Sequence, residues 1–296
     1  GYYRARYGVE VEPERILITP GATGALQLVL AGLVDPGRGV MLSDPGYPCN
    51  RNLVRLFEGV AQAVPVGAAE GYQLTPDLAA AHWRDTTTAL LVATPANPSG
   101  TLLSRQDLTG LAGLCRERGA ALIVDEIYQG LTYGAEDFTA LELGDDLFVI
   151  NSCSKYFGMT GWRLGWLVAP PDAAAGLEVL AQNLFLAAGS VSQHAALAAF
   201  VPETRAILEQ RRDTFRQRRD FLLPALRALG FDIPVTPEGA FYLYANCSAL
   251  ADDSFEFSRR LLEEAGVAVT PGIDFGDFRA GEHVRFAYTT SLEALE

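Results

Sequence analysis

The chain has 296 residues, of which 49% are hydrophobic, and its formal net charge is −13 at pH 7. This length and apolar content are sufficient for a large buried core in one or two domains and exclude a disordered chain. Because the negative charge is repelled by phosphate backbones and anionic lipid, we expect neither nucleic acid nor a membrane surface as a partner.

The cysteines and histidines indicate neither a disulfide framework nor a metal site. The four cysteines lie far apart and form no C-x-x-C pair, which is typical of reduced thiols and predicts a cytoplasmic location. His82, His194 and His283 are also scattered, so we expect no metal. No apolar run approaches the roughly 20 residues that a membrane-spanning helix requires.

Short runs rich in Val, Ile and Leu recur along the first part of the chain, separated by longer helix-like segments. Their continuous apolar character predicts strands buried on both faces, and the helical spacers predict βαβ crossovers. We therefore expect an α/β fold with a mostly parallel sheet sandwiched by helices. The predicted strands cover residues 16–19, 40–43, 89–93, 121–124, 147–150 and 164–168.

The chain changes in character after about Pro202. Residues 203–229 are charged and amphipathic, with Ile207, Phe215, Leu222 and Leu226 at roughly helical spacing. We interpret their arginines as the solvated face of a helix that bridges two subdomains, not as a nucleic-acid patch. Later residues alternate strands with a helix through 257–265. We predict a large domain over residues 1–200 and a smaller α+β domain over residues 201–296.

One composition count points to chemistry, because the 23 basic residues include a single lysine, Lys155. Arginine stays protonated, whereas a lysine amine can lose its proton and add to a carbonyl carbon. A lysine that remains by chance in an arginine-rich chain is the alternative. Ser152 to Lys155 also matches the S-x-x-K motif of β-lactamases and penicillin-binding proteins. Those enzymes need a second lysine in a K-T-G element, which this chain cannot supply.

Residues that follow the predicted strands are candidate ligand-binding residues, since ligands of open α/β sheets bind beyond the carboxyl ends of the strands. Ala22 and Thr23 follow a glycine turn and begin a helix whose first amides can hold a phosphate. Tyr47 lies on a proline-flanked loop from which its ring can cover a flat heterocycle. Asn97 stands between two prolines. An ordinary turn or a packing residue is the alternative for each.

Asp125 ends a predicted strand, where a buried carboxylate is costly unless a positive partner is present. A protonated pyridine nitrogen would be such a partner. A metal-binding pair with Glu126 is the alternative, although no histidine stands nearby in the sequence. Tyr128 follows about one helical turn later and can lie on the same side as Asp125.

Together these segments resemble the class I and II aminotransferases of fold type I, a family that uses pyridoxal 5'-phosphate. The resemblance covers nearly the whole chain. It rests on the glycine turn, N-P-x-G at Asn97, D-E-x-Y at Asp125, and S-x-S-K ending at Lys155 with Arg163 eight residues later. It implies that Lys155 holds the cofactor as a Schiff base and later serves as general base, and that Asp125 keeps the pyridine nitrogen protonated.

The resemblance assigns further roles to residues at the matching positions. Asn97 and Tyr128 would hydrogen-bond the 3'-oxygen of the cofactor ring, and Tyr47 would stack on that ring. The phosphate would be bound by Ala22, Thr23, Ser152 and Arg163, and the substrate carboxylate by Arg285 with Asn97 beside it. The resemblance also implies a homodimer and a further N-terminal segment before Gly1.

The predicted reaction is the transfer of an amino group from an L-amino acid to a 2-oxo acid by a ping-pong mechanism. No cation occurs in residues 182–186, near where some family members carry an arginine for dicarboxylates. This favours neutral or aromatic amino acids and leaves aspartate open. Two other functions share Lys155, Asp125 and Arg163: a C-S lyase or decarboxylase, and a cofactor-binding module of a transcription regulator.

Overall fold

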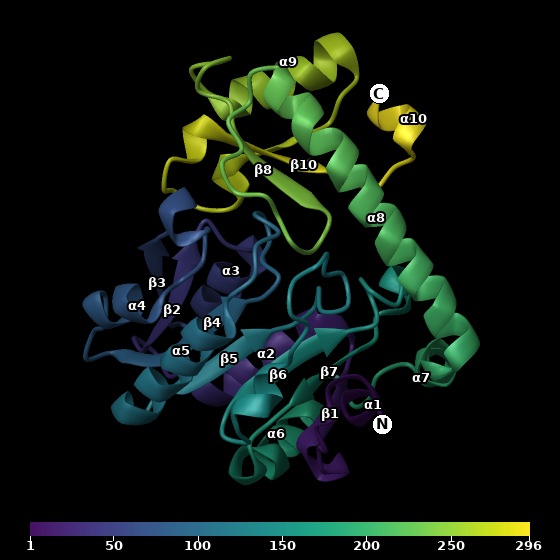
Figure 1. Ribbon diagram of the computed structural model, residues 1–296. Helices are drawn as coiled ribbons and strands as arrows, with labels where there is room; N and C mark the ends of the chain where they lie inside the picture. Colours follow the sequence, from purple (N-terminus) through teal and green to yellow (C-terminus); the bar gives the residue numbers. More distant parts are fainter.

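The computed structural model describes residues 1–296 and contains two β-sheets (Figure 1). The larger sheet has seven strands in the order β1-β7-β6-β5-β4-β2-β3. Only β7 runs antiparallel to the other strands, so the predicted α/β fold with a mostly parallel sheet is confirmed. The strands are Ile16–Thr19, Gly39–Asp44, Val60–Pro65, Thr87–Ala93, Ala121–Asp125, Phe148–Ser152 and Gly165–Val168, numbered β1 to β7.

Both faces of the large sheet are buried against helices. Neighbouring residues of one strand belong to different hydrophobic clusters, as Leu122 and Ile123 of β5 show. One cluster includes side chains of α2 (Gly21–Leu33) and α6 (Pro171–Leu184), and the other includes side chains of α5 (Arg105–Arg118). The continuous apolar runs in the sequence arise because side chains alternate between these two cores.

The smaller sheet has three antiparallel strands in the order β8-β10-β9. These are Tyr242–Asn246, His283–Ala287 and Thr270–Pro271, and helix α9 (Ser254–Ala265) packs against them. Helix α8 (Pro202–Ala228) extends from the region of the large sheet to that of the small sheet (Figure 1). Its Phe215, Leu222 and Leu226 are buried, whereas Ile207 is 59% exposed. The predicted apolar positions therefore mark the packed side of this helix except at Ile207. The domain boundary at residue 200 stays a prediction.

Strand β3 has no counterpart among the predicted strands. Only alternate residues of this edge strand are buried, and its sequence VAQAVP lacks a continuous apolar run. The remaining helices are α1 (Tyr2–Tyr7), α3 (Pro48–Leu56), α4 (Pro76–Ala81), α7 (Ser190–Leu197) and α10 (Leu292–Leu295). None of the helices combines the length and the apolar character that crossing a bilayer demands.

Candidate functional site

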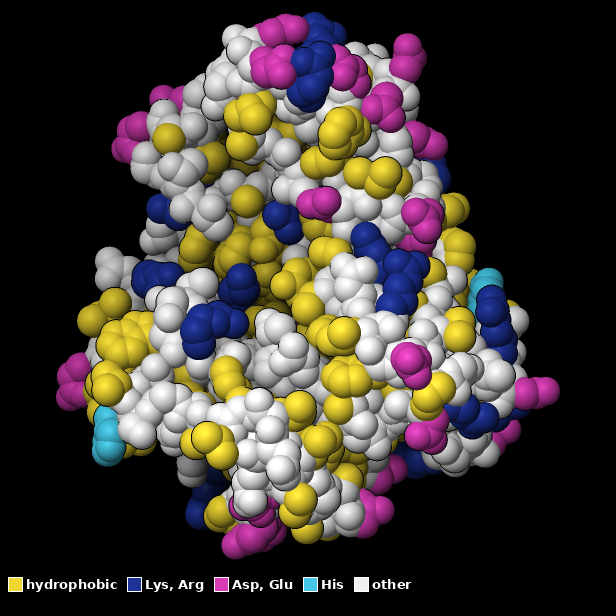
Figure 2. Space-filling view, turned by 180° about the vertical axis from the view of Figure 1, so that it is seen from behind, with side chains coloured by type: hydrophobic (Ala, Val, Ile, Leu, Met, Phe, Trp, Pro, Cys, Tyr) yellow, Lys and Arg dark blue, Asp and Glu magenta, His cyan; other side chains and the backbone are white.

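A cavity of about 310 Å³ lies at the carboxyl ends of the parallel strands and also reaches β8 and β10 of the small sheet. In the space-filling view the surface is hollowed between the two parts of the molecule, with basic side chains around the hollow (Figure 2). The cavity is lined by Ala22, Thr23, Leu26, Tyr47, Ala93, Asn97, Asp125, Ile127, Tyr128, Ser154, Lys155, Thr160, Arg163, Tyr242 and Arg285.

The structure brings together every predicted site residue except Ser152. Ser152 is buried and does not line the cavity, and its Oγ lies 2.9 Å from Ser154 Oγ and 3.0 Å from the Leu164 carbonyl oxygen. The backbone turn after β6 (Phe148–Ser152) instead places Ser154 in the cavity wall. Ser152 therefore holds Ser154 in place, and Ser154 is the serine that a ligand in the cavity can touch.

Asp125 is a buried carboxylate that faces the cavity from the end of β5. The Ile127 amide donates to its Oδ1 at 3.0 Å, and no protein group donates to Oδ2. Burial raises the pKa of Asp125 to about 6, although the Ile127 amide and the charge of Lys155 oppose this shift. A cationic N–H donor in the cavity would satisfy the free oxygen and stabilise the carboxylate.

Lys155 reaches the same cavity from the turn after β6. Its Nζ forms no ion pair and no hydrogen bond, and it lies 5.5 Å from the ring centre of Tyr128 and 5.6 Å from that of Phe241. Burial lowers the pKa of the Lys155 amine, and the charge of Arg285 lowers it further against the opposing effect of Asp125. The amine is thus more easily deprotonated than an exposed lysine, as a nucleophile or a general base requires.

One end of the cavity is built to hold an anion. Helix α2 begins there without a side-chain cap, so its first amides are open to a ligand. The guanidinium of Arg163 lies close to the start of this helix. A Cβ atom at position 21 would be only 2.6 Å from Arg163 Nη2. Gly21 has a φ of +75°, so glycine is required here both for backbone conformation and for this close approach. Helix amides and a guanidinium together favour phosphate.

A second cationic group, Arg285, lies in the cavity wall contributed by β10. Its Nη1 donates to Asn97 Oδ1 at 2.8 Å, and its Nη2 donates to Thr270 Oγ1 at 3.2 Å. The buried Nε has no partner in the protein. Because a carboxylate could accept from this unpaired N–H, the structure offers a second anion-binding group separate from Arg163.

Three hydroxyl-bearing residues of the cavity wall were not predicted from the sequence: Ser154, Thr160 and Tyr242. Tyr242, the first residue of β8, has its hydroxyl 2.8 Å from that of Tyr128. Thr160 Oγ1 donates to the carbonyl of Ser154 at 2.7 Å. Ser154 lies within the S-x-S-K motif and Thr160 lies between Lys155 and Arg163, whereas Tyr242 lies in a strand of the small sheet and follows no strand of the large sheet.

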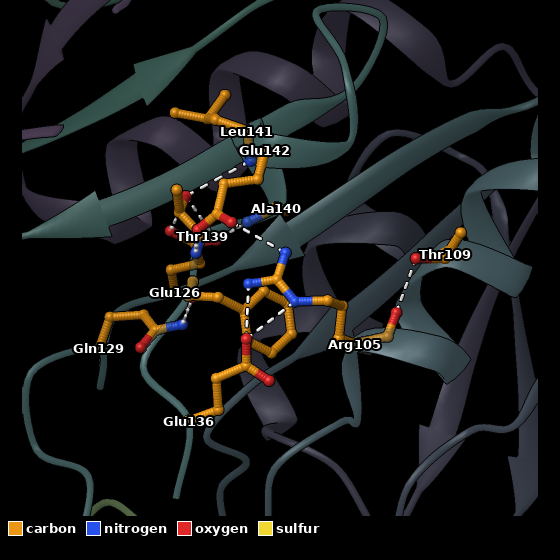
Figure 3. A network of polar contacts seen from close by, with 10 residues as sticks. Arg105, Thr109, Glu126, Gln129, Glu136, Thr139, Ala140, Leu141 and Glu142 are labelled. Atoms are coloured by element: carbon orange, nitrogen blue, oxygen red, sulfur yellow. Dashed lines mark hydrogen bonds and ion pairs between the residues drawn. The ribbon is translucent and has the colours of Figure 1, made fainter. Parts of the chain in front are cut away.

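Next to Asp125 in the sequence, Glu126 belongs to a buried polar network that ties the residues after β5 to residues 138–140 (Figure 3). Glu126 is fully buried, accepts from the Ala140 amide at 2.6 Å, and has both carboxyl oxygens about 3 Å from Thr139 Oγ1. Arg105 forms ion pairs with Glu136 and Glu142 nearby (Figure 3). A protonated Glu126 suits this geometry, since Thr139 can then donate to one carboxyl oxygen and accept from the other.

The pH dependence of stability should report the proton on Glu126. Burial raises its pKa from 4.5 to about 8. Because the folded protein binds this proton more tightly than the unfolded chain, its stabilising effect is complete below pH 4.5 and is lost towards pH 8. Glu126→Gln keeps the hydrogen bonds without an ionisable group. We expect the free energy of unfolding of Glu126→Gln minus that of wild type, measured in urea titrations, to rise by a few kcal/mol between pH 4.5 and pH 8. A difference that stays constant over this range would refute the protonation of Glu126.

Another hollow, of about 490 Å³, is larger, but few polar side chains line it. It lies against α1, β1, β7 and α7, and most of its lining is hydrophobic, including Ile18, Trp166, Leu197 and Phe200. No group of three or more His, Cys, Asp or Glu side chains is placed to hold a metal ion anywhere in the structure. The larger hollow is lined by Tyr2, Tyr3, Cys153 and His194 but by no lysine, arginine or carboxylate, whereas the cavity around Lys155 combines all three.

Comparison with known proteins gives a consistent assignment. The family model for aminotransferase class I and II matches residues 1–296. Valine–pyruvate aminotransferase of Mycobacterium tuberculosis is 36% identical over 97% of this chain and 74% of its own length. Aspartate/prephenate aminotransferase of Thermus thermophilus is 35% identical over 99% of this chain and 76% of its own length.

Solved structures agree in fold as well as in sequence. The crystal structure of an aminotransferase from Mycobacterium tuberculosis superposes with a TM-score of 0.95 at 35% identity, covering 99% of this chain and 76% of that chain. Thermus thermophilus aspartate aminotransferase with maleate gives a TM-score of 0.93 at 35% identity over the same shares of the two chains. The resemblance drawn from the sequence motifs is confirmed, and the chain belongs to the family of class I and II aminotransferases.

Proposed function

We propose that the protein is a pyridoxal 5'-phosphate-dependent aminotransferase that moves an amino group from an L-amino acid to a 2-oxo acid. The observation that carries this proposal is the position of the only lysine, which lines one cavity together with a buried, half-satisfied carboxylate. Arg163 and Arg285 supply two separate anion-binding groups in the same wall. Family membership supports the same function.

The side chains of the cavity fit this cofactor group by group. Asp125 offers a free carboxylate oxygen to a pyridinium N–H, and the open start of α2 with Arg163 suits the phosphate. Asn97 uses Oδ1 for Arg285 and keeps its amide N–H groups free to donate, with Tyr128, to the ring oxygen. Tyr47 is 39% exposed at the cavity mouth, where its ring can cover a flat ligand.

When bound, pyridoxal 5'-phosphate supplies an aldehyde carbon that accepts amines and a ring that withdraws electrons from the substrate. The protein supplies the remaining functions. The Lys155 amine attaches the cofactor covalently, and once released it takes the proton from the substrate Cα atom. Asp125 stabilises positive charge at the ring nitrogen, and Arg285 orients the substrate through its carboxylate.

Neutral amino acids fit the cavity best as amino donors. Its three cations are Lys155, Arg163 and Arg285, and the roles above occupy all of them, so none remains for a second substrate carboxylate. The Mycobacterium tuberculosis relative is named for valine and pyruvate, whereas the Thermus thermophilus relative is named for aspartate and prephenate. We infer a preference for a donor such as valine over aspartate.

Steady-state kinetics with varied donor and acceptor test the proposed reaction. A ping-pong transfer gives parallel double-reciprocal lines, and each half-reaction should proceed without the other substrate. Formation of an oxo acid in many turnovers without an acceptor oxo acid would refute transfer and favour elimination. Valine and aspartate compared as single donors measure the substrate preference.

Replacing Arg285 with lysine should raise the KM for the amino acid more than it lowers kcat. Lysine keeps the charge but loses the planar fork and the contact with Asn97. Hydrogen bonds to charged groups are worth about 1.5–3 kcal/mol, so we expect an increase in KM on the order of 10- to 100-fold. Arg279→Lys is the matched control, because Arg279 is exposed and pairs with Glu282 outside the cavity. An unchanged KM in Arg285→Lys would contradict this role.

We also infer a homodimer, supported by the exposed apolar surface around the larger hollow. Ile18, Trp162, Val191 and Leu197 are all at least 40% exposed, and Ile18 and Leu197 line that hollow. Such a surface is typical of a protein interface. Sedimentation of the wild type and of Leu197→Glu tests this inference, since a charge at the interface should shift the protein towards monomer.

We also infer a cytoplasmic location. Its support is that all four cysteines are free in the structure, three of them buried. Unpaired thiols are typical of proteins in reducing compartments.

A further inference from the structure

Tyr242 contacts Tyr128 on the proposed cofactor side of the cavity and Arg285 on the proposed substrate side. Its hydroxyl lies 2.8 Å from that of Tyr128, and its ring centre lies 4.2 Å from the guanidinium carbon of Arg285. We propose that Tyr242 is a positioning residue that directs the Tyr128 proton towards the ring oxygen of the cofactor and supports Arg285. This inference rests on the proposed function and extends it to a residue outside the recognised motifs.

The donor and the acceptor in the hydrogen bond between Tyr128 and Tyr242 are defined once a ligand is present. Tyr128 has one proton, so if it donates to an anionic oxygen in the cavity, it can only accept from Tyr242. Neither hydroxyl has another hydrogen-bond partner in the protein. Burial raises the pKa of both phenols, so both keep their protons. The result is a chain from Tyr242 through Tyr128 to the ligand, in which each hydrogen bond polarises the next.

The ring of Tyr242 provides the second contact. Arg285 also lies 4.8 Å from the ring centre of Phe275, and its hydrogen bonds to Asn97 and Thr270 leave Nε free. An aromatic face attracts a guanidinium and restricts its tilt. Removing the ring should therefore loosen the substrate carboxylate site, whereas removing the hydroxyl alone should not.

The backbone around Tyr242 is fixed to the large sheet, although β8 belongs to the small sheet. The Gly239 amide donates to the Gly100 carbonyl and the Ala240 amide donates to the Leu131 carbonyl, each at 2.9 Å. Gly100 and Leu131 lie in the loops after β4 and β5. These bonds hold Tyr242 in register with Tyr128, as a rigid positioning residue requires.

The test uses the 296-residue chain loaded with pyridoxal 5'-phosphate and two variants, one that removes only the hydroxyl and one that removes the whole ring. The first readout is the pH midpoint of the visible absorbance change of the bound cofactor. We expect Tyr242→Phe to raise this midpoint by about half a pH unit, roughly a threefold change in proton affinity, because a less polarised Tyr128 stabilises the ring oxygen anion less well. In a Tyr128→Phe background, Tyr242→Phe should change nothing, since the chain is already broken.

The second readout is the affinity for an unreactive carboxylate, 3-methylbutanoate, measured from the same absorbance. Tyr242→Leu should weaken it roughly tenfold and Tyr242→Phe less than about twofold. Tyr244→Phe is the control, because Tyr244 lies on the same strand, stacks on His283 and does not line the cavity.

Each outcome bears on a different part of the account. If wild type shows the cofactor band and Tyr242→Phe has the same pH midpoint as wild type, this inference is overturned while the proposed function stands. A midpoint shift that persists without the Tyr128 hydroxyl, or full carboxylate affinity in Tyr242→Leu, would also overturn it. A wild-type protein without any cofactor band would overturn the proposed function itself and this inference with it.

Discussion

Replacing Lys155 with alanine is expected to abolish covalent attachment of the cofactor and to reduce amino-group transfer by several orders of magnitude. Loss of a general base alone costs roughly 10²- to 10⁴-fold, and the variant also loses the nucleophile. No other lysine exists in the chain. The partly buried position of the amine, without an ion-pair partner and with a lowered pKa, explains why it can serve both roles.

Lys155→Arg is the informative companion variant. It preserves the positive charge in the cavity, but a guanidinium does not lose its proton at ordinary pH. We therefore expect Lys155→Arg to be as inactive as Lys155→Ala in single-turnover assays with a saturating amino acid. Transfer by Lys155→Arg within about tenfold of wild type would show that charge, and not the chemistry of an amine, is what this position contributes.

Replacing Asp125 with asparagine should reduce the rate of the half-reaction on the order of 10²- to 10³-fold, the usual effect of losing one preorganised electrostatic contact. Asparagine has nearly the same shape and can still accept from the Ile127 amide. The change thus removes the negative charge with little effect on packing. Rapid-mixing measurement of the half-reaction tests this, with exposed Asp146→Asn as a control for a general loss of negative charge.

Cofactor affinity as a function of pH gives an independent test of Asp125. Its pKa is raised to about 6 by burial, and a bound pyridinium favours the ionised carboxylate. Below this pH the carboxyl must lose a proton on binding, so wild-type affinity should fall by up to about tenfold per pH unit. The cofactor phosphate also titrates near this pH, but its effect on affinity is the same in wild type and in Asp125→Asn. The ratio of wild-type to variant affinity should therefore fall as the pH is lowered; a constant ratio would contradict the role of Asp125.

The sequence predicted most of the large sheet because its strands are buried on both faces. Leu122 and Ile123 pack into opposite cores, and such strands appear as continuous apolar runs. Edge strand β3 was missed because only its alternate residues are buried. Site residues were predictable where they stand at the carboxyl ends of parallel strands that neighbour each other in the sheet. Asn97 follows β4, and Asp125 ends the adjacent strand β5.

Other parts of the site depend on tertiary structure. Tyr242 reaches the cavity from the other sheet, through backbone bonds to Gly100 and Leu131 that no local pattern reveals. The choice between Ser152 and Ser154 depends on the turn after β6, in which Ser152 turns to the Leu164 carbonyl. The raised pKa of Glu126 depends on its complete burial in the folded chain, which outweighs the lowering effect of its hydrogen bonds with Ala140 and Thr139.

Reductive trapping tests whether Lys155 holds the cofactor covalently. The purified protein would be loaded with pyridoxal 5'-phosphate, reduced with borohydride, digested and mapped by mass spectrometry. Because Lys155 is the only lysine, the account predicts one modified peptide, with the cofactor on Lys155, and its absence from Lys155→Ala. A wild-type protein without that modification, or with the cofactor attached only at the amino terminus, would contradict it.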